Sequence, residues 1–163
     1  LRKLIDDAAD MVNISLSQNK IRFEFDHTIL TTKLIDGTFP DYQRVIPEGN
    51  DKIVELDPKM FTSAVDRVST ISDGKSRAVK IALNGNTMTI SANSPEAGSA
   101  TEEVEVKSDA DLEIGFNAVY LQDITRQIEG EGARFVLADA AAPTIIQDAS
   151  DASALYVLMP LRV

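Results

Sequence analysis

The stretch Lys52-Ile53-Val54-Glu55-Leu56-Asp57-Pro58 predicts where a strand ends and a helix begins. Residues 52–56 alternate in polarity, as a half-buried strand does. Asp57 can accept hydrogen bonds from the free amides at the start of a helix. Pro58 suits the first helical position, where its missing N–H would have no partner. We therefore expect a strand followed by a helix that runs to about Ser72.

Apolar residues recur at helical spacing after Pro58, which predicts one buried helix face. Three strands are expected next, at residues 78–83, 87–92 and 101–106. The pair Asn84-Gly85 favours the positive φ angles of a tight hairpin between the first two strands. The predicted buried face comprises Met60, Phe61, Ala64, Val65, Val68 and Ile71.

The same order of elements returns 60 residues later, where Asn117 stands in the position of Asp57. Asn117 can cap a helix that runs to about Ile128, and Gly130 is expected to end it. The chain therefore holds two complete copies of a β-α-β-β-β unit. In the second copy the strands are expected at residues 112–116, 134–137, 144–147 and 155–161, and the buried helix positions are Leu121, Ile124 and Ile128.

The first fifty residues predict part of an earlier unit. Leu1, Leu4, Ile5, Ala8 and Met11 recur at helical spacing, and strands are expected at residues 13–17, 20–25 and 30–34. Gly37 and Pro40 favour a linker over residues 36–42. We place the domain boundary at about residue 50, which gives domains 1–50 and 51–163. The expected fold class is α+β, with helices on one face of antiparallel sheets.

Composition narrows the possible functions. The 163 residues carry a formal net charge of −10 and no cysteine, which excludes disulfides, thiolate zinc sites and cysteine nucleophiles. No apolar run approaches the roughly 18 residues of a membrane span, and the N-terminus lacks a signal peptide's apolar core. We therefore expect a cytoplasmic protein. The acidic total disfavours a tight grip on DNA but allows a weakly cationic surface on an acidic body.

The sequence gives little support for a catalytic or a metal-binding function. The single histidine, His27, is expected in a turn between strands and has no paired ligands. Gly74-Lys75-Ser76 resembles the end of a phosphate-binding loop, but the required earlier glycine is Ser69 and a helix precedes the segment where a strand is needed. Acidic pairs such as Asp148 and Asp151 lack the spacing of a calcium loop. We expect no enzyme activity, no cofactor and no metal site.

Three stretches together resemble signature segments of the bacterial β sliding clamp family, the DNA polymerase III β subunits. They are residues 33–42 (KLIDGTFPDY), 114–117 (IGFN) and 156–163 (YVLMPLRV). The resemblance implies a DNA clamp fold in which two three-domain subunits close a ring around double-stranded DNA. This chain would then hold the second half of the middle domain and the whole C-terminal domain. Without the N-terminal domain it should not close a ring.

The resemblance also implies a pocket for short linear motifs from the DNA polymerase III α subunit, the clamp loader δ subunit, other polymerases and repair proteins. Val157 and Met159 have an alternative interpretation as core residues of a final strand. Ser76 and Ala141 replace larger apolar residues of some relatives beside the pocket. The matching pocket positions are Pro40, Arg44, Val45, Asn117, Tyr120, Val157, Met159, Pro160, Leu161 and Arg162.

Two further surfaces follow from the same resemblance. Helix residues Arg2, Lys3, Lys59, Arg67 and Arg126 would face DNA; because Asp66 and Asp123 lie among them, contact should be weak and independent of base sequence. Ordinary solvated helix faces are the alternative. The edge strand 101–106 would pair with the other subunit, and the interface residues would be Ile71, Glu102, Glu103 and Val104. The alternative function is a stand-alone peptide-binding domain that does not contact DNA.

Overall fold

The computed structural model describes residues 11–72 and 77–163, and the chain divides into two compact units, Leu1–Asp41 and Tyr42–Val163. The helix expected at the start of the chain, with Arg2 and Lys3, lies outside the described residues, as does Ser76. Among the described residues, neither helix is long and apolar enough to cross a membrane.

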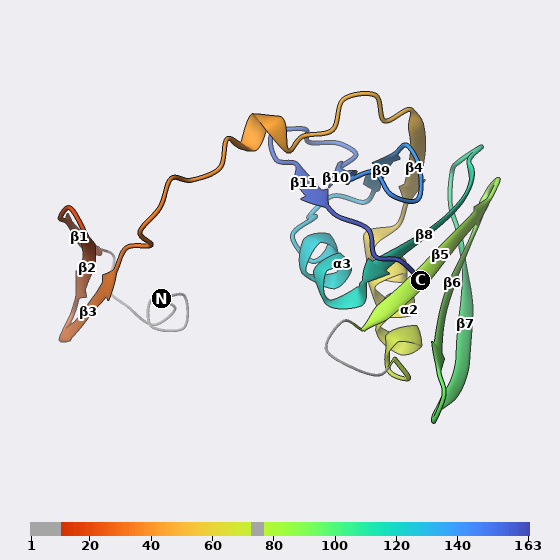
Figure 1. Cartoon of the computed structure of the whole chain (residues 1–163), viewed down its shortest axis with the longest axis horizontal. Coiled ribbons are helices and arrows are strands. Elements are labelled where there is room, and N and C mark those ends of the chain that lie inside the picture. Colours follow the sequence, from red (N-terminus) through yellow and green to blue (C-terminus); the bar gives the residue numbers. More distant parts are fainter. Residues whose placement is uncertain (1–10, 73–76) are drawn as a thin grey trace. The chain divides into compact units, whose positions relative to one another are not determined.

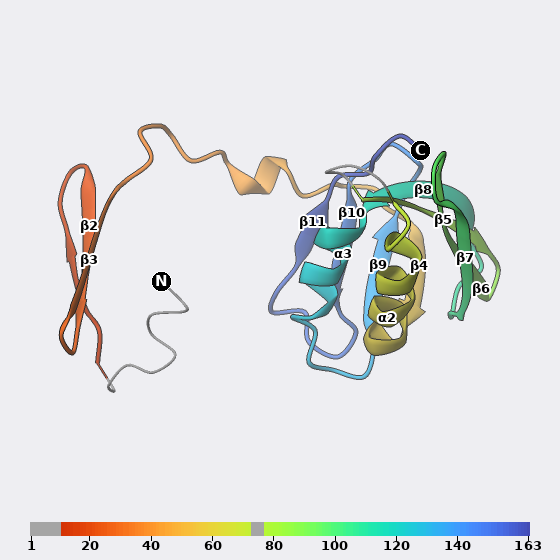
Figure 2. The same cartoon turned by 90° about the horizontal axis from the view of Figure 1, so that it is seen from below.

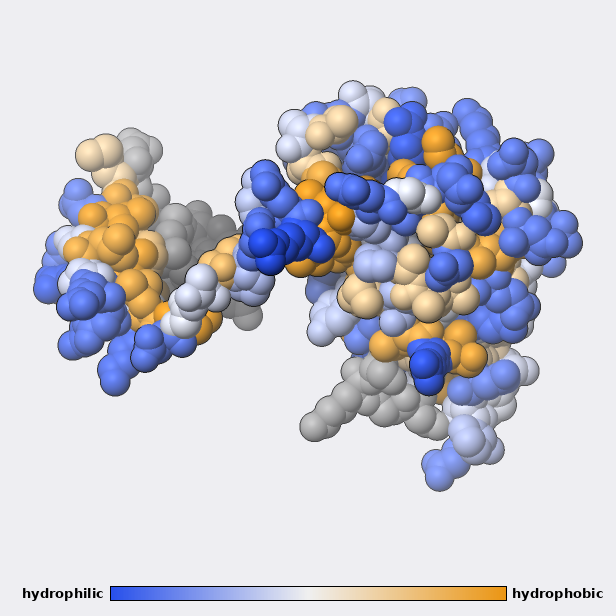
Figure 3. Space-filling view, turned by 45° about the horizontal axis from the view of Figure 1, so that its top comes forward, coloured by the Kyte–Doolittle hydropathy of each residue, from blue (hydrophilic) through white to orange (hydrophobic). Residues whose placement is uncertain are grey.

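The first unit contains a three-stranded antiparallel sheet in the order β1-β2-β3 (Figure 1). Asp26, with φ of 46°, and His27 form the turn between β2 and β3, so the turn expected at His27 is confirmed. Apolar side chains gather on this sheet (Figure 3), and Ile14, Leu16 and Ile29 are all more than 60% exposed. The strands are β1 (Asn13–Leu16), β2 (Lys20–Phe25) and β3 (Thr28–Lys33).

The second unit contains both copies of the predicted β-α-β-β-β unit. A short 3-10 turn, η1 (Tyr42–Arg44), precedes them. The first copy comprises β4 (Lys52–Leu56), α2 (Pro58–Ser69), β5 (Ala78–Asn84), β6 (Thr87–Ser94) and β7 (Gly98–Glu105). The second comprises β8 (Asp111–Asn117), α3 (Ala118–Thr125), β9 (Ala133–Leu137), β10 (Thr144–Asp148) and β11 (Tyr156–Leu158).

Each copy gives its first strand to the sheet of the other copy. The two antiparallel sheets have the orders β11-β10-β9-β4 and β7-β6-β5-β8. Val54 of β4 therefore lies opposite Phe135 of β9, and Ile81 of β5 lies opposite Ile114 of β8. Because each sheet is completed by the other copy, the two copies depend on one another for their hydrogen bonds.

The chain that follows the last strand of each copy returns to the first strand of the same copy. Lys107 exchanges two backbone hydrogen bonds with Glu55, with N–O distances of 2.8 and 3.0 Å. In the second copy, the Leu161 amide donates to the Gly115 carbonyl at 2.8 Å. Glu55 and Gly115 each lie two residues before a helix cap, so these bridges occupy equivalent positions.

The two helices lie side by side on the same side of the sheets (Figure 2). The Asp57 carboxylate accepts from the Lys59 and Met60 amides, and Asn117 accepts from the Val119 amide, so both predicted N-caps are confirmed. The core lies beneath the helices, where Phe61 of α2 meets Phe135 of β9 edge-on at 5.4 Å between ring centroids.

The predicted buried face of α2 is correct at four positions and wrong at one. Phe61, Ala64, Val65 and Val68 are buried, and Ile71 is partly buried against the core, whereas Met60 is 60% exposed. Met60 lies in the first helical turn, where it lines a hollow with Leu56 and Val106.

Both helices end earlier than predicted. α2 ends at Ser69 and α3 at Thr125, and Gly130 terminates neither. Beyond each end, a backbone amide donates to the carbonyl three residues earlier, from Ser72 to Ser69 and from Ile128 to Thr125. Such 3-10 hydrogen bonds tighten the last turn. The hairpin prediction was also one residue early: Asn84 pairs with Thr87, so the loop is Gly85-Asn86, and φ at Gly85 is 56°.

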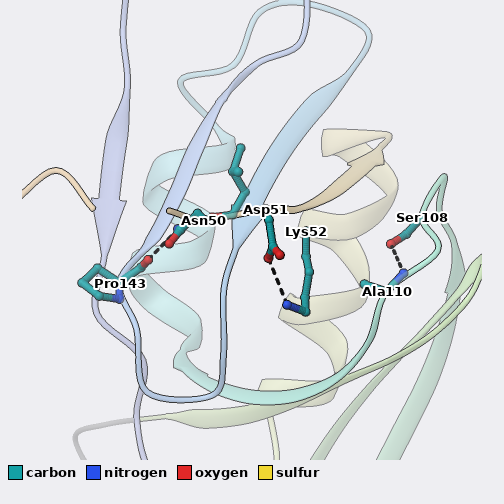
Figure 4. Close-up of polar contacts among 7 residues, drawn as sticks. Asn50, Asp51, Lys52, Ser108, Ala110 and Pro143 are labelled. Carbon is teal, nitrogen blue, oxygen red and sulfur yellow. Dashed lines mark hydrogen bonds and ion pairs between the residues drawn. The ribbon is translucent and has the colours of Figure 1, made fainter. Parts of the chain in front are cut away.

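The second unit begins before β4. The Asn50 side-chain amide donates to the carbonyl oxygens of Val136 (2.8 Å) and Pro143 (2.9 Å), and Lys52 pairs with Asp51 at 3.0 Å (Figure 4). These contacts hold residue 50 within the second unit. The division between compact units therefore lies at Asp41 and Tyr42, several residues before the expected boundary of about 50.

Candidate peptide-binding groove

A groove of about 650 Å³ lies in the second unit, between the start of α3 and the C-terminal tail. The tail supplies most of one wall, and α3 supplies the other. Aliphatic and aromatic side chains dominate the surface. The groove is lined by Asn117, Tyr120, Asp123, Ile124, Leu155, Tyr156, Val157, Leu158, Met159, Pro160 and Leu161.

The tail is held in place at two points. β11 pairs with β10, where Leu158 lies opposite Thr144 and is buried. Beyond Pro160, which cannot donate a backbone hydrogen bond, the tail crosses β8 through the Leu161–Gly115 bridge. Residues 159–160 therefore connect the β11 pairing to the bridge at Gly115, and Met159 is 58% exposed.

Gly115 makes this crossing possible. A Cβ at this position would lie 2.5 Å from Cγ1 of Val163 and 2.6 Å from the carbonyl oxygen of Leu161. Real Cβ atoms do not approach other atoms so closely, so any larger residue would displace the tail. Sequence reasoning quoted Gly115 only as part of a motif and missed this role.

The start of α3 contributes both polar and apolar groups. Asn117 accepts from the Val119 amide at 2.9 Å, and the Ala118 amide donates to the Arg77 carbonyl at 3.0 Å. One turn later, Tyr120 is 57% exposed. A Tyr ring and a flexible Met side chain facing the same hollow suit apolar anchors of varied shape.

Six of the ten predicted pocket residues line this groove. Arg162 instead lines an adjoining hollow of about 480 Å³, together with Ala141 and Val163. Arg44 and Val45 do not line the groove, and Pro40 belongs to the other unit. The six lining residues are Asn117, Tyr120, Val157, Met159, Pro160 and Leu161.

Val157 and Met159 are not buried core residues of the final strand, which was their alternative interpretation. Val157 is half-buried and Met159 is mostly exposed, whereas Leu158 between them is the buried residue. Sequence reasoning missed five lining residues. Ile124 could have been found, because it lies four positions after Tyr120 on the same helix face; the others are Asp123, Leu155, Tyr156 and Leu158.

The helix residues predicted to face DNA are partly engaged within the chain. The Arg67 guanidinium binds Glu102 of β7 through two nitrogens, with Nε 3.0 Å from Oε2. Mainly through this side-chain hydrogen bonding, the pairing lowers the pKa of Glu102 and raises the pKa of Arg67. Arg126 donates to the Gln122 side chain at 3.2 Å, and Lys59 is exposed.

The proposed edge strand is an edge in this chain, since β7 ends its sheet. Its side chains differ in availability. Glu102 is turned to Arg67, Glu103 is exposed, and Val104 is 5% exposed within the core. A second strand that paired with β7 would therefore contact its backbone and the exposed Glu103 side chain, and not the buried side chain of Val104. Ile71 is partly buried against the same core.

Within residues 11–72 and 77–163, no group of three or more His, Asp or Glu side chains is placed to hold a metal ion. Asp148 instead serves the loop around it. Its carboxylate accepts from the amides of Gly130 and Ser150, both at 2.8 Å, and from the Ser150 hydroxyl at 2.7 Å. These bonds lower the pKa of Asp148, the Ser150 hydroxyl most.

The paired β-α-β-β-β copies and the groove define the class of protein as a DNA clamp domain. Residues 43–162 match the family model for the C-terminal domain of the DNA polymerase III beta subunit, and residues 1–41 match the model for its central domain. The chain belongs to the DNA polymerase III beta subunit family.

The relatives with similar sequences are beta sliding clamps. The beta sliding clamp of Caulobacter vibrioides (strain NA1000 / CB15N) is 52% identical over 163 residues, which are 99% of this chain and 44% of the relative. That of Escherichia coli (strain K12) is 36% identical over 164 residues, 100% of this chain and 45% of the relative. The chain thus spans less than half the length of these relatives.

Solved structures agree with the fold. A crystal structure of the C. crescentus beta sliding clamp matches with a TM-score of 0.88 and 52% identity, over 99% of this chain and 44% of the other. A Bartonella birtlesii sliding clamp, solved bound to griselimycin, matches with a TM-score of 0.87 and 46% identity over the same shares. The α+β clamp fold expected from the sequence is therefore confirmed.

Proposed function

We propose that this chain is part of a sliding clamp for a bacterial replicative DNA polymerase and that its groove binds short linear motifs of partner proteins. The groove between α3 and the tail carries the proposal. It presents an exposed Tyr120 and an exposed Met159 above a half-buried apolar floor. Convergent apolar side chains with a few polar groups at the edge are typical of peptide pockets.

The whole protein would encircle double-stranded DNA without reading its sequence. Lys59, Arg67 and Asp66 lie on α2, Asp123 lies on α3 and Arg126 caps its end, so the helical layer carries charges of both signs. Weak attraction of this kind allows sliding, because few phosphate counterions are displaced at any position. Partners would include the polymerase α subunit, the clamp loader δ subunit, other polymerases and repair proteins.

The remaining parts of the proposal concern organisation. Residues 1–41 would belong to the second half of the middle domain and end in the interdomain linker, and residues 42–163 would form the C-terminal domain. Arg2 and Lys3 would join the DNA-facing set, and Pro40, Arg44, Val45 and Arg162 would extend the peptide site. Pairing along β7 would close a homodimer ring in the cytoplasm. The protein would act as a non-enzymatic processivity factor.

The groove is tested by binding of a fluorescent peptide of the Gln-Leu-x-Leu-Phe type. We expect Met159→Ala to weaken binding about tenfold, because it removes an apolar wall. Met60→Ala is the matched control, since Met60 is equally exposed but lies at the start of the other helix. Equal affinities of Met159→Ala and the unaltered chain would contradict the groove assignment.

The clamp function is tested on the full-length protein. It should dimerise, stay on nicked circular DNA after loading, and escape when the circle is cut. A stand-alone peptide-binding domain would bind the same peptide but show no difference between circular and linear DNA. The DNA topology experiment therefore separates the two functions independently of peptide affinity.

A further inference from the structure

The peptide groove lies at the start of the helix of the second β-α-β-β-β copy. A second hollow lies at the corresponding position of the first copy. This hollow, of about 330 Å³, lies at the start of α2, beside the chain that leaves β7. Asp57 takes the position of Asn117 and Met60 the position of Tyr120, each 60 residues earlier. The Glu55–Lys107 bridge takes the position of the Gly115–Leu161 bridge.

We propose that this hollow is a second peptide-binding site, which takes an apolar anchor residue flanked by basic residues. The proposal goes beyond the groove at α3, because it concerns a separate surface with a different charge. The site is lined by Glu55, Leu56, Asp57, Met60, Glu105, Val106, Lys107, Glu131, Gly132 and Ala149.

The apolar part of the site is built like that of the first groove. Leu56 and Val106 are 5% and 4% exposed and form a floor that belongs to the core. Met60 stands above it with 60% of its surface exposed, although its neighbour Phe61 is fully buried. An exposed, flexible Met beside a buried apolar floor can close over an inserted side chain.

The charge of the lining selects the partner. Four carboxylates, Glu55, Asp57, Glu105 and Glu131, face a single cation, Lys107. Glu55 already binds Arg134 at 2.7 Å, and Asp57 caps α2. Among the ion pairs formed by the described residues, neither Glu105 nor Glu131 takes part. These two exposed carboxylates are thus available to lysine or arginine side chains of a peptide.

The first groove has a different charge, since Asp123 is the only charged residue among the described residues that line it. The two sites should therefore prefer different peptides although they share one backbone plan. The volume of the second hollow lies at the lower end of the range for ligand pockets, which suits a single large anchor and not an extended apolar motif.

The test uses the 163-residue chain and a short amidated peptide with one central phenylalanine between lysines. Fluorescence anisotropy measures affinity, and chemical shifts of the isotope-labelled chain locate the site. We expect saturable binding that weakens with salt and shifts the amides of Met60, Val106 and Gly132. Met60→Ser and the double variant Glu105→Lys/Glu131→Lys should each weaken binding about tenfold or more.

Two controls make the outcome decisive. Tyr120→Ala, the equivalent change in the first groove, should leave this binding unchanged and weaken the Gln-Leu-x-Leu-Phe peptide. A second peptide with glutamate in place of lysine should not bind the hollow. Absence of binding, equal affinity in Met60→Ser, or shifts confined to the tail and α3 would each overturn the proposal while leaving the first groove unaffected.

Discussion

The side chain of Val163 lies directly over Gly115, so close that an added Cβ would come within 2.5 Å of its Cγ1 atom. This contact, together with the Leu161–Gly115 bridge, fixes where the C-terminal tail crosses β8. The position of the tail in turn decides whether Met159 and Pro160 face the start of α3. A glycine in β8 thus shapes the peptide groove although it contributes no side chain.

Gly115→Ala should therefore damage both the fold and the groove. Overpacking of this kind costs about 1–3 kcal/mol, and the displaced tail should weaken binding of the Gln-Leu-x-Leu-Phe peptide. Urea unfolding and anisotropy measure the two effects. Val163→Ala is the comparison: its side chain is 64% exposed and the Leu161–Gly115 bridge remains in this variant, so stability should fall less than in Gly115→Ala. Unchanged peptide affinity in Gly115→Ala would show that the crossing does not position the groove.

The two helix caps allow stability to be separated from binding. Asn117→Ala and Asp57→Ala each remove a side-chain acceptor for the first helical amides, and each should lower the unfolding free energy by about 1 kcal/mol. Only Asn117 lines the groove at α3. The Gln-Leu-x-Leu-Phe peptide should therefore bind Asn117→Ala more weakly than Asp57→Ala. Equal losses of affinity would assign the effect to helix stability alone.

A hydroxyl pair joins the two helices. The Oγ1 atoms of Thr62 and Thr125 lie 2.6 Å apart, and Thr125 is 2% exposed. Replacing either threonine with valine should destabilise the fold modestly, because the remaining hydroxyl loses its interhelical partner but keeps its bond to a carbonyl of its own helix, Pro58 for Thr62 and Leu121 for Thr125. A double-mutant cycle should give a coupling of about 1 kcal/mol. Additive effects of the two changes would contradict an interhelical bond.

Asp148 predicts a specific response to acid. Its pKa is lower in the folded chain, so its bonds stabilise the fold at pH values above the unfolded pKa of about 3.9. This contribution is lost as the pH falls through the lowered folded-state pKa, because the unfolded chain binds the proton more readily. Asp148→Asn should make the acid limb of the stability profile shallower in urea unfolding.

Ser150→Ala provides an intermediate case for this profile. It removes the hydroxyl that contributes most to the lowered pKa of Asp148 but leaves the amide donors of Gly130 and Ser150 in place. Its acid limb should fall between those of the unaltered chain and Asp148→Asn. Three parallel limbs would show that the carboxylate does not contribute through its ionisation.

Many features of the fold could be predicted from the sequence because they depend on neighbouring residues. Asp57 and Asn117 cap amides two or three positions away, and the strand before each cap alternates within five residues. The 60-residue repeat made the second copy recognisable from the first. The fold class followed from these patterns, and six of the groove residues followed from the resemblance of three short segments.

The exact ends of elements were less predictable. Ser72 and Ile128 carry helical spacing, yet both lie in tightened turns beyond the helices. Met60 also fits the buried pattern, yet it is 60% exposed. Periodicity reports the direction of a side chain around a helix and not the extent of the surface that covers it.

The sequence by itself determined the two repeated units, their caps and the apolar faces that drive them together. Only the tertiary structure decided that β4 joins β9, that β8 joins β5, and that Arg67 binds Glu102. It also decided that the tail crosses Gly115 and so forms a groove. These pairings join residues far apart in the chain, so they depend on how whole sheets and helices pack, which no local pattern encodes.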